Sequence, residues 1–147
     1  MDEQILKLKS PEDCERFAIN ATRLDRADLA KLARKRAVEL RSHVQGASTE
    51  VERECLMAVY AYEETLYKKN GKRTRATRTW QMIERHGILP AVERAVNRPH
   101  ETVGYTSLLD VGLEDFSFEA VVVKYPDLFS REAVDRSKQR IEQWKKK

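Results

Sequence analysis

The sequence predicts an all-α fold, a single compact bundle of about six to seven helices over residues 1–147. Only five glycines and four prolines occur in the chain, so few positions interrupt a helix. Charged residues make up 35% of the chain and hydrophobic residues 41%. The apolar residues recur every three or four positions, as on the buried face of an amphipathic helix. A chain of this length is also large enough to bury a core as one domain.

The first two helices follow from a start signal and two apolar stripes. Ser10 stands before Pro11 and two acidic residues, an arrangement typical of a helix N-terminus. Apolar residues share one face over residues 14–24, and again over residues 29–44 after a turn near Asp25. We therefore expect two consecutive helices.

A third, longer helix is bounded by signals at both ends. Thr49 and Glu52 have the spacing of a capping box, which satisfies free backbone N–H groups of a first turn. The apolar stripe over residues 51–66 predicts a buried face. Asn70-Gly71 is typical of a helix C-terminus.

The next two helices meet at a glycine. A fourth helix is expected from about Arg75 to Gly87, where a glycine in the left-handed conformation would end it. Pro90 opens a short fifth helix, which ends before Pro99 because a residue preceding proline avoids helical geometry. Residues 100–105 are predicted to form a loop.

The C-terminal part contains one ambiguous segment. Residues 113–125 combine side chains that favour strands with others that suit a helix. We predict a helix there, because no second strand is available to pair with a first. Ser130 is expected to cap a final helix, with Trp144 on its buried face.

Charge is distributed unevenly along the chain, although the net charge is only +4. Residues Lys68–Arg98 carry nine lysines and arginines against two glutamates, whereas residues 99–129 carry one lysine against six acidic residues. This asymmetry predicts a polarised surface.

The segment 68–78 holds six positive charges and no acidic residue. Several of its arginines fall at the start of the fourth helix, where the helix dipole disfavours cations. A bound phosphate would reverse that penalty, because it accepts hydrogen bonds from free backbone N–H groups and from guanidinium groups. The segment therefore predicts nucleic-acid binding, with duplex DNA as the expected partner. An ordinary solvated charged face is the alternative.

Ten residues are the predicted nucleic-acid contacts. Those expected to neutralise phosphates are Lys68, Lys69, Lys72, Arg73 and Arg75. Those expected to reach a groove are Arg78, Gln81, Arg85, Arg94 and Asn97. Trp80 shares the opposite, apolar face of the fourth helix, and we expect it to pack in the core.

Residues 77–97 have the outline of a helix-turn-helix unit, with Gly87 in the short turn. Arg94 and Asn97 would face outward on the second helix, and such side chains can read guanine and adenine edges. Ile83 stands where close helix packing favours a small residue. Two packed helices without a role in DNA recognition therefore explain the same pattern.

The segment Asn70–Asn97 also resembles an uncharacterised helical module associated with bacterial restriction-type nucleases. That module lies beside a separate catalytic domain. The resemblance covers residues 70–97 only, and it implies DNA-related work as an accessory in restriction or defence.

Two other functions are compatible with the sequence. The basic face would also suit an acidic protein partner, which would make the chain a protein-interaction module. An enzyme without a recognisable motif would use His100 and Glu101 as its acid–base candidates. No Gly-rich phosphate loop or nucleophile motif occurs, so no catalytic residue is predicted.

No metal or cofactor is predicted. Cys14 and Cys55 are too few for a disulfide framework or a zinc site, and we expect them to be small buried hydrophobes. The three histidines, His43, His86 and His100, lack the spacing of metal ligands, and His86 is expected to be a helix-terminal cation.

The sequence favours a cytoplasmic protein that does not contact the membrane. It contains no secretory signal and no run of the roughly 20 apolar residues that a spanning helix needs.

Glu119, Lys124 and Asp127 are residue types found in nucleases, but their spacing does not place two carboxylates and a lysine around one metal.

Overall fold

The computed structural model describes residues 3–44, 47–98 and 105–145. These residues form helices and no strand, which confirms the predicted all-α class. Every helix predicted from apolar periodicity is present, and three short helices, α1, α7 and η2, add to them. The elements are α1 (Glu3–Leu6), α2 (Pro11–Arg23), α3 (Ala27–Val44), α4 (Glu50–Asn70), α5 (Thr77–His86), α6 (Ile88–Val96), α7 (Tyr105–Val111), η1 (Glu114–Phe116), α8 (Phe118–Lys124), η2 (Pro126–Leu128) and α9 (Arg131–Lys145), where η marks a 3₁₀ helix.

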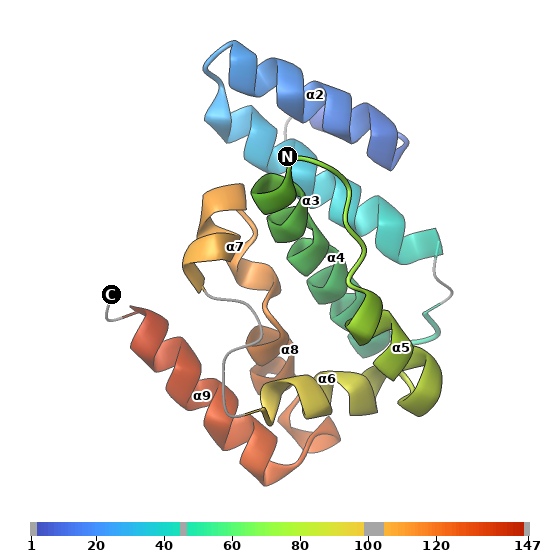
Figure 1. The fold of residues 1–147 in the computed structure, drawn as a ribbon, viewed down its shortest axis with the longest axis vertical. Helices are drawn as coiled ribbons and strands as arrows, with labels where there is room; N and C mark the ends of the chain where they lie inside the picture. Colours follow the sequence, from blue (N-terminus) through green and yellow to red (C-terminus); the bar gives the residue numbers. More distant parts are fainter. Residues whose placement is uncertain (1–2, 45–46, 99–104, 146–147) are drawn as a thin grey trace.

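The helices α2 and α3 form a hairpin at one end of the molecule (Figure 1). The Ser10 hydroxyl accepts a hydrogen bond from the Asp13 N–H at 3.1 Å, which confirms the predicted cap of α2. Asp25 turns the chain with a left-handed φ of 63°. Small side chains let the two helices and α1 pack closely, and their shared core contains Ile5, Ala18, Ala21, Ala30 and Ala33.

The long helix α4 lies at the centre, with α3 on one side and α6, α7 and α8 on the other (Figure 1). One face of α4, with Cys55 and Val59, joins a core that includes residues of α6, α8 and α9. The adjoining face, with Leu56 and Tyr60, joins a second core that includes Val38 and residues of α7. Because α4 serves both cores, it positions the elements around it.

Both predicted ends of α4 are confirmed. The Thr49 hydroxyl accepts from the Glu52 N–H at 3.2 Å and donates to the Glu52 carboxylate at 3.1 Å. Gly71 ends the helix in the left-handed conformation, with φ 73° and ψ 8°, and its N–H donates to the Tyr67 carbonyl at 2.8 Å. The glycine matters here because a side chain at this φ would be strained.

The predicted corner between α5 and α6 exists, but three details of the prediction are wrong. The helix α5 begins at Thr77 rather than near Arg75, because the Glu63 carboxylate accepts the Ala76 N–H at 2.8 Å and holds the preceding segment against α4. Gly87 has the expected positive φ of 95°, but its ψ of 168° lies outside the left-handed helical region. That extended ψ lets α6 begin directly at Ile88, two residues before the predicted start at Pro90.

Residues 113–125 are helical, as predicted, in the two pieces η1 and α8. Ser117 caps α8. Buried Glu119 on α8 accepts from Arg140 on α9 at 3.1 Å, and Arg140 also donates to the Val96 carbonyl at the end of α6 at 2.9 Å. One arginine therefore links three helices. Trp144 is buried on α9, as expected.

The remaining expectations concern the loop and the membrane. The predicted loop over residues 100–105 lies outside the described residues, except for Tyr105, which begins α7. Among the helices of the described ranges, none combines the length and the apolar character needed to cross a bilayer.

Candidate nucleic-acid interface

Most of the predicted nucleic-acid contacts lie on one continuous stretch of chain, from the end of α4 to α6, and are exposed to solvent. We call this the basic surface. Its members are the exposed predicted contacts that form no ion pair with a carboxylate of the described residues, together with Arg98, which follows α6: Lys68, Lys69, Lys72, Arg75, Arg78, Gln81, Arg85, Arg94 and Arg98.

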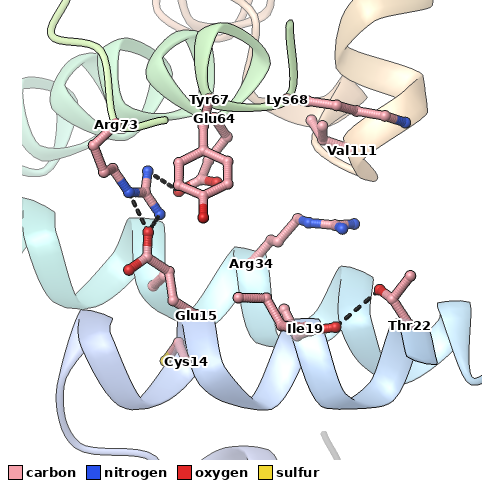
Figure 2. Close-up of a pocket in the computed structure, with 12 residues that line it drawn as sticks. Cys14, Glu15, Ile19, Thr22, Arg34, Glu64, Tyr67, Lys68, Arg73 and Val111 are labelled. Atoms are coloured by element: carbon pink, nitrogen blue, oxygen red, sulfur yellow. Dashed lines mark hydrogen bonds and ion pairs between the residues drawn. The ribbon is translucent and has the colours of Figure 1, made fainter. Parts of the chain in front are cut away.

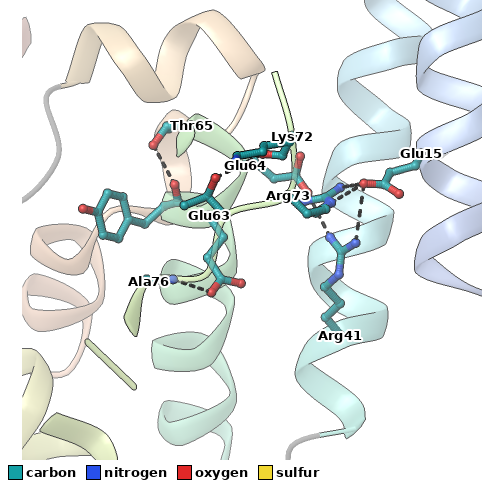
Figure 3. A network of polar contacts seen from close by, with 10 residues as sticks. Glu15, Arg41, Glu63, Glu64, Thr65, Lys72, Arg73 and Ala76 are labelled. Atoms are coloured by element: carbon teal, nitrogen blue, oxygen red, sulfur yellow. Dashed lines mark hydrogen bonds and ion pairs between the residues drawn. The ribbon is translucent and has the colours of Figure 1, made fainter. Parts of the chain in front are cut away.

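Arg73 does not belong to the basic surface, because its charge is paired inside the protein. Its guanidinium forms an ion pair with the Glu64 carboxylate at 2.8 Å and a second one with Glu15 of α2. Arg41 of α3 joins the same two carboxylates, with distances of 2.9 Å to Glu64 and 4.0 Å to Glu15. Figure 3 shows this closed group of two arginines and two glutamates bridging the hairpin to α4.

The charge of Arg73 is therefore balanced inside the protein. Burial by itself would lower the pKa of Arg73, but Glu64 and Glu15 outweigh that effect and raise the pKa above its ordinary value. The Arg73 guanidinium also lies 4.4 Å from the centre of the Tyr67 ring. The predicted role of Arg73 as a phosphate contact thus competes with three internal partners, and we remove it from the interface.

A hollow of about 260 Å³ lies at the N-terminus of α5. Three arginines line it: Arg75, Arg78 and Arg98. The Thr77 and Thr79 residues of the first helical turn line it as well. Its remaining walls are mostly apolar, from Tyr62, Leu66, Ala76, Met82, Ala95 and Phe118.

No side chain caps α5, because the N-cap residue is Ala76. The first N–H groups of a helix lack partners inside the helix and point toward this end. Within the described part of the chain, Arg75, Arg78 and Arg98 form no ion pair with a carboxylate. The hollow therefore combines uncompensated positive charge with a helix N-terminus.

Trp80 lies next to Arg75, one of the arginines that line this hollow. It is partly buried and packs against both core clusters, with its ring centre 5.3 Å from that of Tyr60. Its indole N–H donates to Glu63 at 2.7 Å. The Arg75 guanidinium lies 5.0 Å from the ring centre, within the range of a cation–π contact. The predicted core placement of Trp80 is thus confirmed for one side of the ring, while the other side supports Arg75.

The outer face of α5 carries Arg78, Gln81 and Arg85, all exposed as predicted. His86 at the end of α5 differs from its predicted role as a cation. Partial burial and then the positive charges of Arg94 and Arg85 hold the pKa of His86 below its ordinary value. The protonated form, and with it the predicted cationic role of His86, is therefore disfavoured.

The helix α6 is less available than a recognition helix. It packs against α4, α5, α8 and α9. The Glu93 carboxylate accepts from the Ser130 N–H at 2.6 Å, and the side-chain oxygen of Asn97 is buried. Arg94 on α6 is exposed, whereas Asn97, the C-cap residue that follows α6, is partly buried. We therefore remove Asn97 from the interface.

The catalytic alternatives gain no support from the described residues. Glu119 is buried against Arg140, and Lys124 pairs with Glu54 at 2.6 Å. No group of three or more potential metal ligands occurs among the residues that the structure describes. His100 and Glu101 lie outside them.

Cys14 and Cys55 are free and buried, as predicted. Burial raises the pKa of the Cys14 thiol to about 11 and that of Cys55 to about 12. Both thiols are therefore protonated at neutral pH and are poor nucleophiles.

The ion-paired group around Glu64 was not predicted from the sequence, although a signal existed. Glu64 follows Leu56 and Tyr60 at a spacing of four, on a face of α4 that is otherwise apolar. An acidic residue in such a position predicts a charged partner, because an unpaired buried carboxylate is costly.

Comparison of the chain with protein-family models, with curated proteins and with solved structures finds no match.

Proposed function

We propose that the protein binds nucleic acid, with duplex DNA as the preferred partner, through the basic surface and without chemistry of its own. The observation that carries this proposal is the hollow at the start of α5, where Arg75, Arg78 and Arg98 surround an uncapped helix N-terminus.

The argument rests on an otherwise unfavourable arrangement of charge. The N-terminal end of a helix carries partial positive charge, so nearby arginines raise the free energy of the folded protein. A phosphate group in the hollow offsets this repulsion, because its oxygens accept from guanidinium groups and from the free N–H groups of the first turn. Arg75 is held near this position by the Trp80 ring.

Contacts to the backbone of the nucleic acid, rather than to bases, explain the surface best. Lys68, Lys69 and Lys72 precede Arg75 in the sequence, are exposed and add long-range attraction for a polyanion. Arg78 and Arg85 extend the positive charge along α5. Since α6 is largely covered, we expect little discrimination between base sequences.

The decisive experiment is a salt titration of binding to duplex DNA, single-stranded DNA and RNA. The double variant Arg75→Gln/Arg78→Gln removes two of the proposed phosphate contacts. We expect weaker binding to all duplex sequences, and a log–log salt slope that is flatter by roughly two units, since each contact contributes about 0.9.

The matched control is Arg131→Gln/Lys138→Gln, which removes the same charge from exposed positions on α9. If the control weakens binding as much as the test variant, the attraction is a general charge effect and the interface is wrong. If the wild-type protein binds none of the three nucleic acids near 50 mM salt, a concentration at which phosphate contacts are strong, the proposed function is wrong. Capture of an acidic protein that the test variant loses would favour the interaction-module alternative.

A further inference from the structure

A second hollow lies between the α2–α3 hairpin on one side and α4 with α7 on the other (Figure 2). It encloses about 260 Å³, which exceeds the roughly 150 Å³ of an apolar cavity that holds one benzene molecule. Apolar side chains form much of its wall: Cys14, Ala18, Ile19, Ala37 and Val111. The thiol of Cys14 belongs with them because burial keeps it protonated.

The negative charges around this hollow are paired with arginines, whereas the positive charge of Arg34 is not paired with a carboxylate of the described residues. Glu15 and Glu64 contribute negative charge, but Arg73 and Arg41 neutralise both of them. Arg34 also lines the hollow, and it pairs with no carboxylate within the described ranges of the chain.

Two further donors surround the same space. Lys68 donates to the backbone carbonyl of Asp110 at 3.5 Å, and it forms no ion pair with a carboxylate of the described residues. Figure 2 shows the Tyr67 ring directed into the hollow from α4 and the Arg34 side chain extending from α3 into the space below Val111 of α7 in this view. The charge left uncompensated there is therefore positive, and a phenol hydroxyl lies at the same mouth.

A partly buried guanidinium loses some of its hydration and gains most from a charge-assisted hydrogen bond to an anion. The apolar walls, in turn, gain from an apolar group that displaces water. A single ligand satisfies both requirements only when it joins a negative head to an apolar body.

We propose that this hollow binds a small organic anion, whose carboxylate or phosphate head contacts Arg34, Lys68 and Tyr67 and whose apolar body is about the size of one aromatic ring. The site shares Lys68 with the basic surface, but it lies apart from the hollow at the start of α5 and uses Arg34, which is not part of that surface. An effect of Arg34→Gln therefore tests this proposal separately from nucleic-acid binding.

The test compares matched probes by chemical-shift perturbation of the backbone amides. Phenylacetate carries both head and body, phenylacetamide keeps the body but lacks the charge, and acetate keeps the charge but lacks the body. We expect phenylacetate to shift the amides of Ile19, Ala37 and Val111 and to bind at least about tenfold more tightly than either partial probe. Hexanoate and phenyl phosphate test whether other bodies and heads are accepted.

Variants locate the site. Arg34→Gln should weaken phenylacetate binding about tenfold or more, because it removes a charge-assisted hydrogen bond, while the melting temperature stays close to that of the wild type. Arg34→Lys should retain part of the affinity. Arg23→Gln, which removes an exposed charge from α2 outside the hollow, is the control and should bind as the wild type does.

Three results would overturn the proposal. The first is equal binding of phenylacetamide, which would make the hollow merely apolar. The second is equal binding of acetate or no effect of Arg34→Gln, which would make the attraction merely electrostatic or place it elsewhere. The third is the absence of binding by phenylacetate, hexanoate and phenyl phosphate at concentrations up to about 10 mM, above which affinity carries little specificity.

Discussion

Arg73 and Arg75 are separated by a single residue in the segment between α4 and α5, yet their surroundings are opposite. Arg73 turns toward the α2–α3 hairpin and meets the carboxylates of Glu64 and Glu15. Arg75 is exposed, lies over the Trp80 ring and lines the hollow at the start of α5. One arginine holds two parts of the fold together, and the other is available to a partner.

The difference shows that the density of positive charge along a chain does not measure the charge available to a ligand. Glu64 has only 6% of its side chain exposed, so its two arginine partners contact it where solvent screens little. The hollow at α5 has no such carboxylate among the described residues. Predictions that separate these two environments therefore test the proposed interface directly.

The largest expected effect on stability comes from replacing Trp80, whose ring contacts the exposed Arg75. Trp80→Ala should lower the free energy of unfolding by about 3 kcal/mol, at the lower end for a truncated core tryptophan because the ring is only partly buried. Urea denaturation measures this. A variant that unfolds like the wild type but no longer binds DNA would instead make Trp80 a stacking contact.

Glu64→Gln should have the next largest effect. The substitution removes the more buried of the two carboxylates that Arg41 and Arg73 share, and leaves them Glu15. We expect a loss of about 2 kcal/mol in the free energy of unfolding, less than for a fully buried pair because Arg73 reaches solvent. Glu63→Gln is a useful comparison, since it removes a neighbouring carboxylate that instead contacts Ala76 and Trp80. An unchanged stability of Glu64→Gln would show that the ion-paired group is not a structural link.

Replacing Arg73 or Arg75 should change stability less than the two substitutions above. The two variants should differ from each other, since one affects stability and the other affects DNA binding. Arg73→Gln should destabilise the protein by about 1 kcal/mol, because Arg41 still pairs with Glu64. It should leave the salt slope of DNA binding unchanged. Arg75→Gln should alter stability by no more than about 0.5 kcal/mol but flatten the salt slope by about one unit. Equal behaviour of both variants in both measurements would contradict the distinction drawn between them.

The helices could be predicted from the sequence because they depend on local features. Apolar periodicity and the caps at Ser10, Thr49 and Gly71 act within a few residues, so they are visible in the chain. The start of α5 was misplaced because a distant carboxylate, that of Glu63, fixes the preceding segment. Local propensity carries no information about such a partner.

The candidate interface was predictable only in outline for the same reason. The exposed face of Arg78, Gln81 and Arg85 follows from the spacing of residues on one helix. The pairing of Arg73 with Glu15 joins residues 58 positions apart in the sequence. Its loss from the interface depends on how the hairpin packs on α4, and helix periodicity does not specify that arrangement.

The smallest expected effect concerns His86, which reports the positive potential at the exposed end of the basic surface. Its pKa lies below the ordinary value, first because the imidazole is partly buried and then because Arg94 and Arg85 repel its proton. The unfolded chain therefore binds this proton at a higher pH than the folded protein does. The contribution of His86 to stability is present above the unfolded pKa, near 6.5, and is lost as the pH falls through the folded pKa.

An NMR titration of the imidazole should show Arg94→Gln moving the pKa of His86 upward and Arg94→Lys leaving it nearly unchanged. Bound duplex DNA should also move it upward, because phosphates near Arg85 and Arg94 would cancel their repulsion. A folded-state pKa at or above 6.5 in the free protein would mean that the two arginines do not act on His86, and that this end of the basic surface is already neutralised by groups of the protein itself.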